Sequence, residues 1–115
     1  MNNSKIILAA LVSSKLDLEE YLAPIRKKLL SQGNEILHEL IQRRGVSRSK
    51  TEGGSKNMDA PLNPKTYLGS GKILELKDIV SEKNPDAVLF LNELSGSQVS
   101  SIESIIECEV ELLKI

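Results

Sequence analysis

Residues 67–72, Tyr-Leu-Gly-Ser-Gly-Lys, stand between a long polar segment and a strongly periodic helical pattern. Two glycines, a serine suited to capping and a lysine predict that a helix begins at this junction. Such a helix end offers backbone N–H groups and one positive charge, so it is a candidate site for an anion such as phosphate. The segments before and after it predict the two halves of one small α/β sheet.

Upstream of the junction, two segments predict strands. Residues 6–12 are an uninterrupted apolar run, typical of a parallel strand buried on both faces. Residues 35–42 would fit a helix as well as a strand, and the turn at residues 33–34 favours the strand. His38 is then a packed or half-exposed strand residue rather than a ligand or a base.

A helix is predicted between these strands. Apolar residues recur at helical spacing from Leu18 to Leu29, and Asp17 is suited to the N-cap. Pro24 falls within this pattern, where proline costs about 3 kcal/mol. Either the helix kinks at Pro24, or residues 17–22 form a separate turn and the main helix begins with Pro24 in its first turn. The sequence leaves both alternatives open.

Downstream of the junction, the pattern predicts helix, strand, helix and strand. Helical spacing runs over residues 73–80 and ends at Asn84-Pro85. Residues 87–91 are a second buried strand, and a Ser-x-x-Gln capping box at residues 95–98 opens the last helix. Residues 110–115 predict a closing edge strand, because their apolar and polar residues partly alternate.

This order of elements predicts the fold class. Right-handed crossovers give an α/β fold with a small open four-stranded parallel sheet, ordered 2-1-3-4, and helices on both faces. The 115 residues are expected to form a single domain over 1–115. A basic, Gly/Ser-rich loop at about residues 45–63 would interrupt it, and a loop of that length is generally functional or disordered.

The composition indicates a protein of a reducing compartment. Cys108 is the sole cysteine of the sequence, so no internal disulfide can form. The apolar run at residues 6–12 is too short to span a bilayer. We therefore expect a soluble, cytoplasmic protein without a membrane partner.

Charge is divided along the chain. Residues 26–72 carry ten bases and four acids, a net charge of +6, whereas residues 73–115 carry three bases and nine acids, a net charge of −6. This division suggests one face built for a polyanion, although scattered surface charge would give the same count. Between residues 43 and 63 there is no aromatic side chain on which a base could stack, so phosphate contact is favoured over base reading.

Catalytic motifs are mostly missing from the sequence. Residues 69–72 resemble part of a nucleotide phosphate loop, but Thr66 and Ile73 stand where that motif needs glycine and Ser or Thr. Asn92-Glu93 is a polar pair at the end of a predicted strand, where ligands of open α/β sheets bind. We find no Ser/His/Asp set, carboxylate pair or metal-spaced cluster, and predict no catalytic and no metal-binding residue. The glycines at residues 69 and 71 have two open interpretations, a structural turn or a phosphate contact.

Three segments in order resemble the N-terminal domain of HflX-type GTPases, of the Obg-HflX superfamily. They are Leu-Ile-Gln-Arg-Arg at residues 40–44, Pro-Lys-Thr-Tyr-Leu-Gly-Ser-Gly-Lys at 64–72 and Asn-Glu-Leu-Ser-Gly-Ser-Gln at 92–98. The resemblance covers roughly residues 35–115, and the rest matches only in layout. In that family a helical hairpin and a Ras-like GTP-binding domain follow, and the protein associates with the large ribosomal subunit.

The resemblance implies a ribosome- or RNA-contacting domain that is not catalytic by itself. It implies rRNA of the large subunit as the partner, with GTP and Mg held in a GTPase domain outside this chain and no cofactor within it. A monomer is expected. The candidate RNA- or phosphate-binding residues are Arg43, Arg44, Lys65, Gly69, Ser70, Gly71 and Lys72.

The chain departs from the family pattern in three places. The connection at residues 45–63 is longer than usual, Asn92 stands where aspartate is usual, and the sequence stops at Ile115, before the hairpin and the GTPase domain. It therefore resembles either an excised domain or a stand-alone remnant. Two alternatives remain: a nucleotide-phosphate-binding domain that uses the helix start at residues 69–72, and a structural module that self-associates through its last strand.

Overall fold

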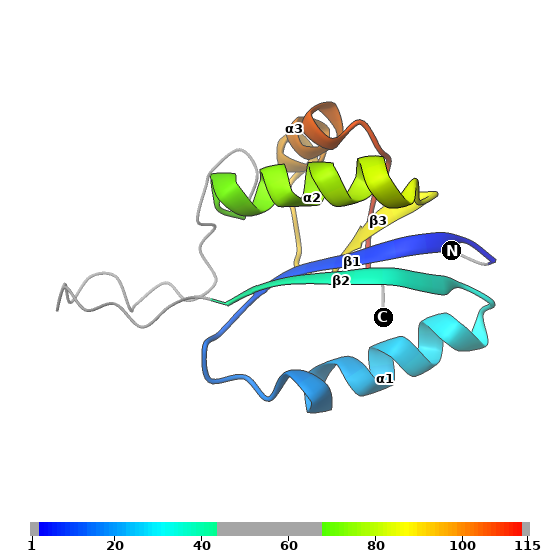
Figure 1. Ribbon diagram of the computed structural model, residues 1–115. Helices are drawn as coiled ribbons and strands as arrows, with labels where there is room; N and C mark the ends of the chain where they lie inside the picture. Colours follow the sequence, from blue (N-terminus) through cyan, green and yellow to red (C-terminus); the bar gives the residue numbers. More distant parts are fainter. Residues whose placement is uncertain (1–2, 44–67, 114–115) are drawn as a thin grey trace, which may run out of the picture.

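β1 (Lys5–Val12) lies inside a four-stranded parallel sheet ordered β2-β1-β3-β4, so the predicted fold class and strand order are confirmed (Figure 1). The computed structural model describes residues 3–43 and 68–113. Helix α1 covers one face of the sheet, and α2 and α3 cover the other (Figure 1). The remaining elements are α1 (Leu18–Ser31), β2 (Glu35–Arg43), α2 (Ser70–Lys83), β3 (Ala87–Phe90), α3 (Gly96–Ile106) and β4 (Val110–Leu112).

The core has two layers, one on each face of β1. All residues from Ile6 to Val12 are buried, as expected of a central strand whose two faces are both covered. On the α2 and α3 face, Ile7 and Leu11 pack with Phe90 and the buried residues of the two helices. On the α1 face, Ile6 and Leu8 pack with Leu29 and Leu89.

Helix α1 runs unbroken through Pro24. It begins at Leu18, and the Asp17 side chain caps it by accepting a hydrogen bond from the N–H of Glu20. The alternative in which the main helix begins at Pro24 is therefore wrong. Pro24 has no N–H, so the carbonyl of Glu20 lacks its helical hydrogen bond. Both residues are exposed, and water can therefore bond to that carbonyl.

A buried asparagine joins the end of α1 to the starts of β1 and β2. The Asn34 side chain is 4% exposed. Its Oδ1 accepts a hydrogen bond from the N–H of Ser4 at 3.0 Å, and its Nδ2 donates one to the carbonyl of Leu29 at 3.1 Å. Gly33, at φ +83°, provides the left-handed turn that brings Asn34 to this position.

Strand β2 has a bulge that the sequence pattern conceals. Its register to β1 pairs Ile6 with Ile36 but Ile7 with His38, so Leu37 is an extra residue. Leu37 packs against the α2 and α3 core. The bulge explains why the segment looked helical, and the prediction of a strand with a half-buried His38 is confirmed.

Helix ends follow the predictions except at α2. Gly69 is the N-cap of α2, and Ser70 is the first residue inside the helix, so the prediction of a capping serine is wrong. The capping box of α3 is confirmed, since Ser95 and Gln98 exchange both hydrogen bonds. None of the described helices is long and apolar enough to cross a membrane.

The Asn34 bridge yields a stability prediction. Asn34→Ala removes the side-chain hydrogen bonds to the Ser4 N–H and the Leu29 carbonyl, and we expect a loss of about 2 kcal/mol in the free energy of unfolding. The measurement is urea denaturation followed by circular dichroism. Gln32→Ala, at an exposed position of the same turn, should change stability little. Equal midpoints for the two variants would contradict this role.

Candidate functional site

The candidate site is the edge of the sheet at the carboxyl ends of the strands. In a parallel sheet these ends meet, and the end of β2, the β1–α1 connection and the start of α2 all lie at this edge (Figure 1). The edge therefore brings Arg43, at the end of β2, to the same end of the molecule as residues 69–72. Arg44, Lys65 and the connection at 45–63 lie outside the described residues, and the same holds for the side chain of Ser70.

The start of α2 is attached to the end of β2 by a side chain. The N–H of Gly69 donates a hydrogen bond to Oε1 of Gln42 at 2.9 Å. A Cβ at Gly69 would lie 3.2 Å from Nε2 of the same glutamine, a tight contact. Gly69 thus supports the structural interpretation: it permits close approach of helix and strand.

Gly71 differs from Gly69. A Cβ built at Gly71 would meet no described atom within 4 Å, and its φ is not positive. Neither backbone conformation nor packing against the described residues requires a glycine there. The described residues therefore leave the space beside the Cα of Gly71 unfilled.

Lys72 is available in the same turn. Its side chain is 32% exposed, and Nζ lies 3.4 Å from Oε1 of Glu75. A surface ion pair at this spacing is weak, because water screens it. An anion at the helix start can compete for the lysine.

Arg43 shares this edge but turns to the other face of the sheet. Its Nη1 donates hydrogen bonds to the carbonyls of Ser13 at 3.2 Å, Ser14 at 3.1 Å and Leu16 at 3.0 Å. These bonds hold the β1–α1 connection, whereas the neighbouring Gln42 reaches α2. The carbonyls are neutral, so the guanidinium keeps its positive charge and contributes to the field at the edge.

Asn92 closes the crevice between β1 and β3. This is the point where the connections diverge to opposite faces, and ligands of open α/β sheets commonly bind there. Oδ1 of Asn92 accepts a hydrogen bond from the N–H of Leu11 at 2.7 Å, and Nδ2 donates one to the carbonyl of Leu11 at 3.0 Å. From the sequence, Asn92 is a polar residue at the end of the sheet where ligands commonly bind. In the structure its side chain instead holds the backbone of Leu11.

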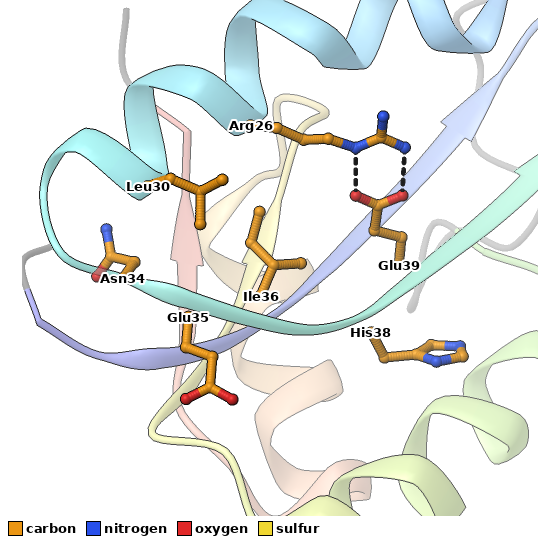
Figure 2. Close-up of a pocket in the computed structure, with 7 residues that line it drawn as sticks. All are labelled: Arg26, Leu30, Asn34, Glu35, Ile36, His38 and Glu39. Atoms are coloured by element: carbon orange, nitrogen blue, oxygen red, sulfur yellow. Dashed lines mark hydrogen bonds and ion pairs between the residues drawn. The ribbon is translucent and has the colours of Figure 1, made fainter.

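A second polar cluster, missed by the sequence analysis, lies on the α1 face of β2. Arg26 on α1 pairs with Glu39 on β2 through two hydrogen bonds of 2.6 and 2.7 Å (Figure 2). The Arg26 guanidinium also contacts Glu19 at 2.9 Å. The hydrogen bond from Arg26 lowers the pKa of the Glu19 carboxyl, and the bonds to Glu39 and Glu19 raise the pKa of Arg26. Glu19 and Arg26 are seven residues apart and so lie on one face of α1, which the sequence does show. The sequence does not show that Glu39 of β2 pairs with the same arginine.

Within residues 3–43 and 68–113, no three His, Cys, Asp or Glu side chains gather where they could hold a metal ion. Cys108 is half-buried beside the carbonyl of Pro85, and burial raises the pKa of its thiol, so it is a poor nucleophile. The arrangement is suited to binding an anion at the α2 start.

Comparison with known proteins gives consistent matches. The family described as "GTP-binding GTPase N-terminal" matches residues 19–111. The "GTPase HflX" of Flavobacterium psychrophilum is 31% identical over 113 residues, which are 96% of this chain and 24% of that protein. The "GTPase HflX" of Thermofilum pendens is 34% identical over 108 residues, 94% of this chain and 21% of that protein. The chain thus spans about a quarter or less of the length of these relatives.

The two hydrogen bonds between the Asn92 side chain and the backbone of Leu11 can be tested by a substitution of nearly the same size and shape. Asn92→Asp keeps an acceptor for the Leu11 N–H but places a carboxylate against the Leu11 carbonyl, so we expect a loss of about 1–3 kcal/mol in the free energy of unfolding at pH 7. Relative to wild type at the same pH, the loss should shrink near pH 4, because a protonated aspartate can donate to that carbonyl.

Urea denaturation at both pH values measures the effect of Asn92→Asp. Glu93→Gln, at the exposed next position, is the matched control and should be close to neutral. A loss that does not depend on pH would contradict the donated hydrogen bond.

Proposed function

This chain belongs to the family of GTP-binding GTPase N-terminal domains, and from that premise we propose that it is an RNA-contacting domain for the large ribosomal subunit. It acts without catalysis of its own, as part of an HflX-type GTP-binding protein. The relatives are GTPases by name, and these residues correspond to a minor part of them. We place GTP and Mg outside these residues, in the GTPase domain of the whole protein.

The observation that carries the proposal is the open first turn of α2. Its N–H groups follow Gly69, Gly71 leaves space for a close approach, and Lys72 provides a positive charge. Phosphate groups bind such helix starts, where the helix dipole adds to the hydrogen bonds. Arg43, the last residue of β2, adds positive charge next to Gln42, the residue that attaches α2 to this strand.

An extended polyanion fits this edge better than a single nucleotide. One anion at an exposed helix start gains only about 0.3–1 kcal/mol, so useful affinity needs several contacts along a backbone. The Gly69 N–H already bonds Gln42, and Asn92 fills the crevice where α/β sheets usually take a nucleotide. The chain offers no phosphate-loop pattern at the α2 start.

The proposed RNA contact also implies where the protein acts and in which oligomeric state. A domain that contacts ribosomal RNA works in the cytoplasm and needs no membrane. We propose that it binds as a monomer, with phosphate contacts that position it on the RNA rather than read its bases. Arg44 and Lys65, which lie outside the described residues, are the other candidate phosphate contacts of the sequence.

Co-sedimentation with purified large ribosomal subunits tests this function. Binding should weaken steeply as salt rises, because phosphate contacts release counterions. Lys72→Glu should weaken binding several-fold and lower the slope of log affinity against log salt by about one. Lys77→Glu, the same charge change at an exposed position further along α2, is the matched control and should have a much smaller effect.

Two results would contradict the proposal. One is co-sedimentation that is insensitive to salt; the other is an equal loss for the Lys72 and Lys77 variants. Calorimetry with ATP and GTP separates the nucleotide alternative: binding that disappears in Lys72→Ala would assign the α2 start to a nucleotide phosphate instead.

A further inference from the structure

Two neighbouring residues at the end of β2 attach the strand to segments on opposite faces of the sheet. Successive side chains of a strand point to opposite faces. Gln42 accordingly bonds the Gly69 N–H on the α2 face, and Arg43 bonds three carbonyls of the β1–α1 connection on the other face. The two side chains therefore join three segments of the carboxyl edge: the β1–α1 connection, the end of β2 and the start of α2 (Figure 1).

The bonds of Arg43 restrain the end of β2. Nη1 lies 3.2, 3.1 and 3.0 Å from the carbonyl oxygens of Ser13, Ser14 and Leu16. These carbonyls belong to a turn that is itself closed by a hydrogen bond from the Leu16 N–H to the Ser13 carbonyl at 3.2 Å. The last residues of an element are the first to open, so an anchor at the final residue of the strand opposes fraying there.

Gln42 depends on that restraint. It directly precedes the anchored residue, and its Oε1 must stay within hydrogen-bond distance of the Gly69 N–H, now 2.9 Å away, to keep α2 attached. The N-cap of α2 is a glycine, so no side chain of the cap itself fixes this helix end. A displacement of the end of β2 would therefore pass through Gln42 to the first turn of α2, which carries Lys72.

We propose that Arg43 is a positioning residue of the RNA-contacting edge and not itself a ligand of phosphate. It acts through Gln42: by fixing the end of β2 to the β1–α1 connection, it keeps the start of α2 where Lys72 can meet the RNA backbone. This role rests on the proposed function and adds to it, because it assigns the contact and the placement of the contact to different basic residues.

A lysine at position 43 separates charge from geometry. It carries the same positive charge as arginine, but its side chain ends one bond short of Nη1. The ammonium group therefore cannot reach all three carbonyls at the observed distances unless the turn moves. Arg43→Lys keeps what a phosphate ligand needs and loses what a positioning residue needs.

The first test follows the amides of the ¹⁵N-labelled free chain by NMR. Arg43→Lys should shift the amides of residues 13–16 and also those of residues 69–72, on the opposite face of the sheet. Gln42→Leu should shift the amides of residues 69–72. In the double variant the shifts at residues 69–72 should equal those of Gln42→Leu, because residues in one chain of contacts do not act additively.

Lys15→Gln is the matched control. Lys15 is an exposed residue of the same connection, and loss of its charge leaves the three carbonyl bonds of Arg43 intact. This variant should leave the amides of residues 69–72 unshifted. Circular dichroism checks that every variant is folded.

The second test is co-sedimentation with purified large ribosomal subunits. Arg43→Lys should weaken binding about threefold or more, because the position of the α2 start is lost. The slope of log affinity against log salt should not change, since the charge is kept. Gln42→Leu should weaken binding to the same extent, whereas Lys15→Gln should stay close to wild type.

The outcomes separate positioning from phosphate contact. Shifts at residues 69–72 that occur in Arg43→Lys, not in Lys15→Gln, and that do not add in the double variant support the proposal. Unshifted amides at residues 69–72 in Arg43→Lys, or additive shifts, would overturn it. Wild-type affinity in Arg43→Lys with a salt slope lower by about one in Arg43→Gln would overturn it too, since residue 43 would then be a phosphate ligand.

Failure of the proposed function has a different signature. Wild-type chain that does not co-sediment with the subunits would contradict the RNA contact. The amide shifts are measured without RNA, so they still decide whether Arg43 sets the position of α2.

Discussion

The structure depends on satisfying every backbone group of β1, the strand that is buried on both faces. β3, its neighbour, has only four residues against the eight of β1. Two side chains that flank β3 continue the pairing where its backbone stops. At one end, Oδ2 of Asp86 accepts a hydrogen bond from the Lys5 N–H at 2.8 Å, while the Asp86 N–H bonds the Lys5 carbonyl at 2.7 Å. At the other end, Asn92 makes the equivalent pair of bonds with Leu11. Leu11 is buried and an unpaired buried group is costly, so Asn92 compensates there for the short length of β3, while Asp86 extends the pairing at the exposed start of β1.

This arrangement restricts where the domain can bind a ligand. The crevice that commonly receives a ligand in an open α/β sheet holds the Asn92 side chain. The β1–α1 connection is held in turn by Arg43 through three carbonyls. Among the described residues, the first turn of α2, beside Gly71 and Lys72, is the part of the carboxyl edge that these bonds do not involve.

Local sequence patterns predicted the elements of this fold but not the long-range bonds that position them. The apolar run of β1, the Asp17 cap and the Ser95–Gln98 capping box are signals contained within a few residues, and each was read correctly. The bonds of Asn92 to Leu11 and of Gly69 to Gln42 span 81 and 27 residues, so no periodicity encodes them. For the same reason the sequence favours Ser70 as the cap of α2, because serine is the better capping residue, whereas the glutamine at the end of β2 needs a glycine opposite it. Pro24 was ambiguous because its cost depends on exposure, which the sequence does not give.

The fold shows which charged residues of the chain are free to act on a polyanion and which are already paired. Counted along the sequence, Arg26 belongs to the basic half, yet it lies between Glu39 and Glu19 and offers no free charge to a polyanion. Glu35, from the same half of the sequence, is an exposed acid at the start of β2. The positive residues Arg43 and Lys72 lie at the carboxyl end of that strand, where α2 begins. The count along the sequence therefore overstates the positive charge that residues 26–72 can offer to a polyanion.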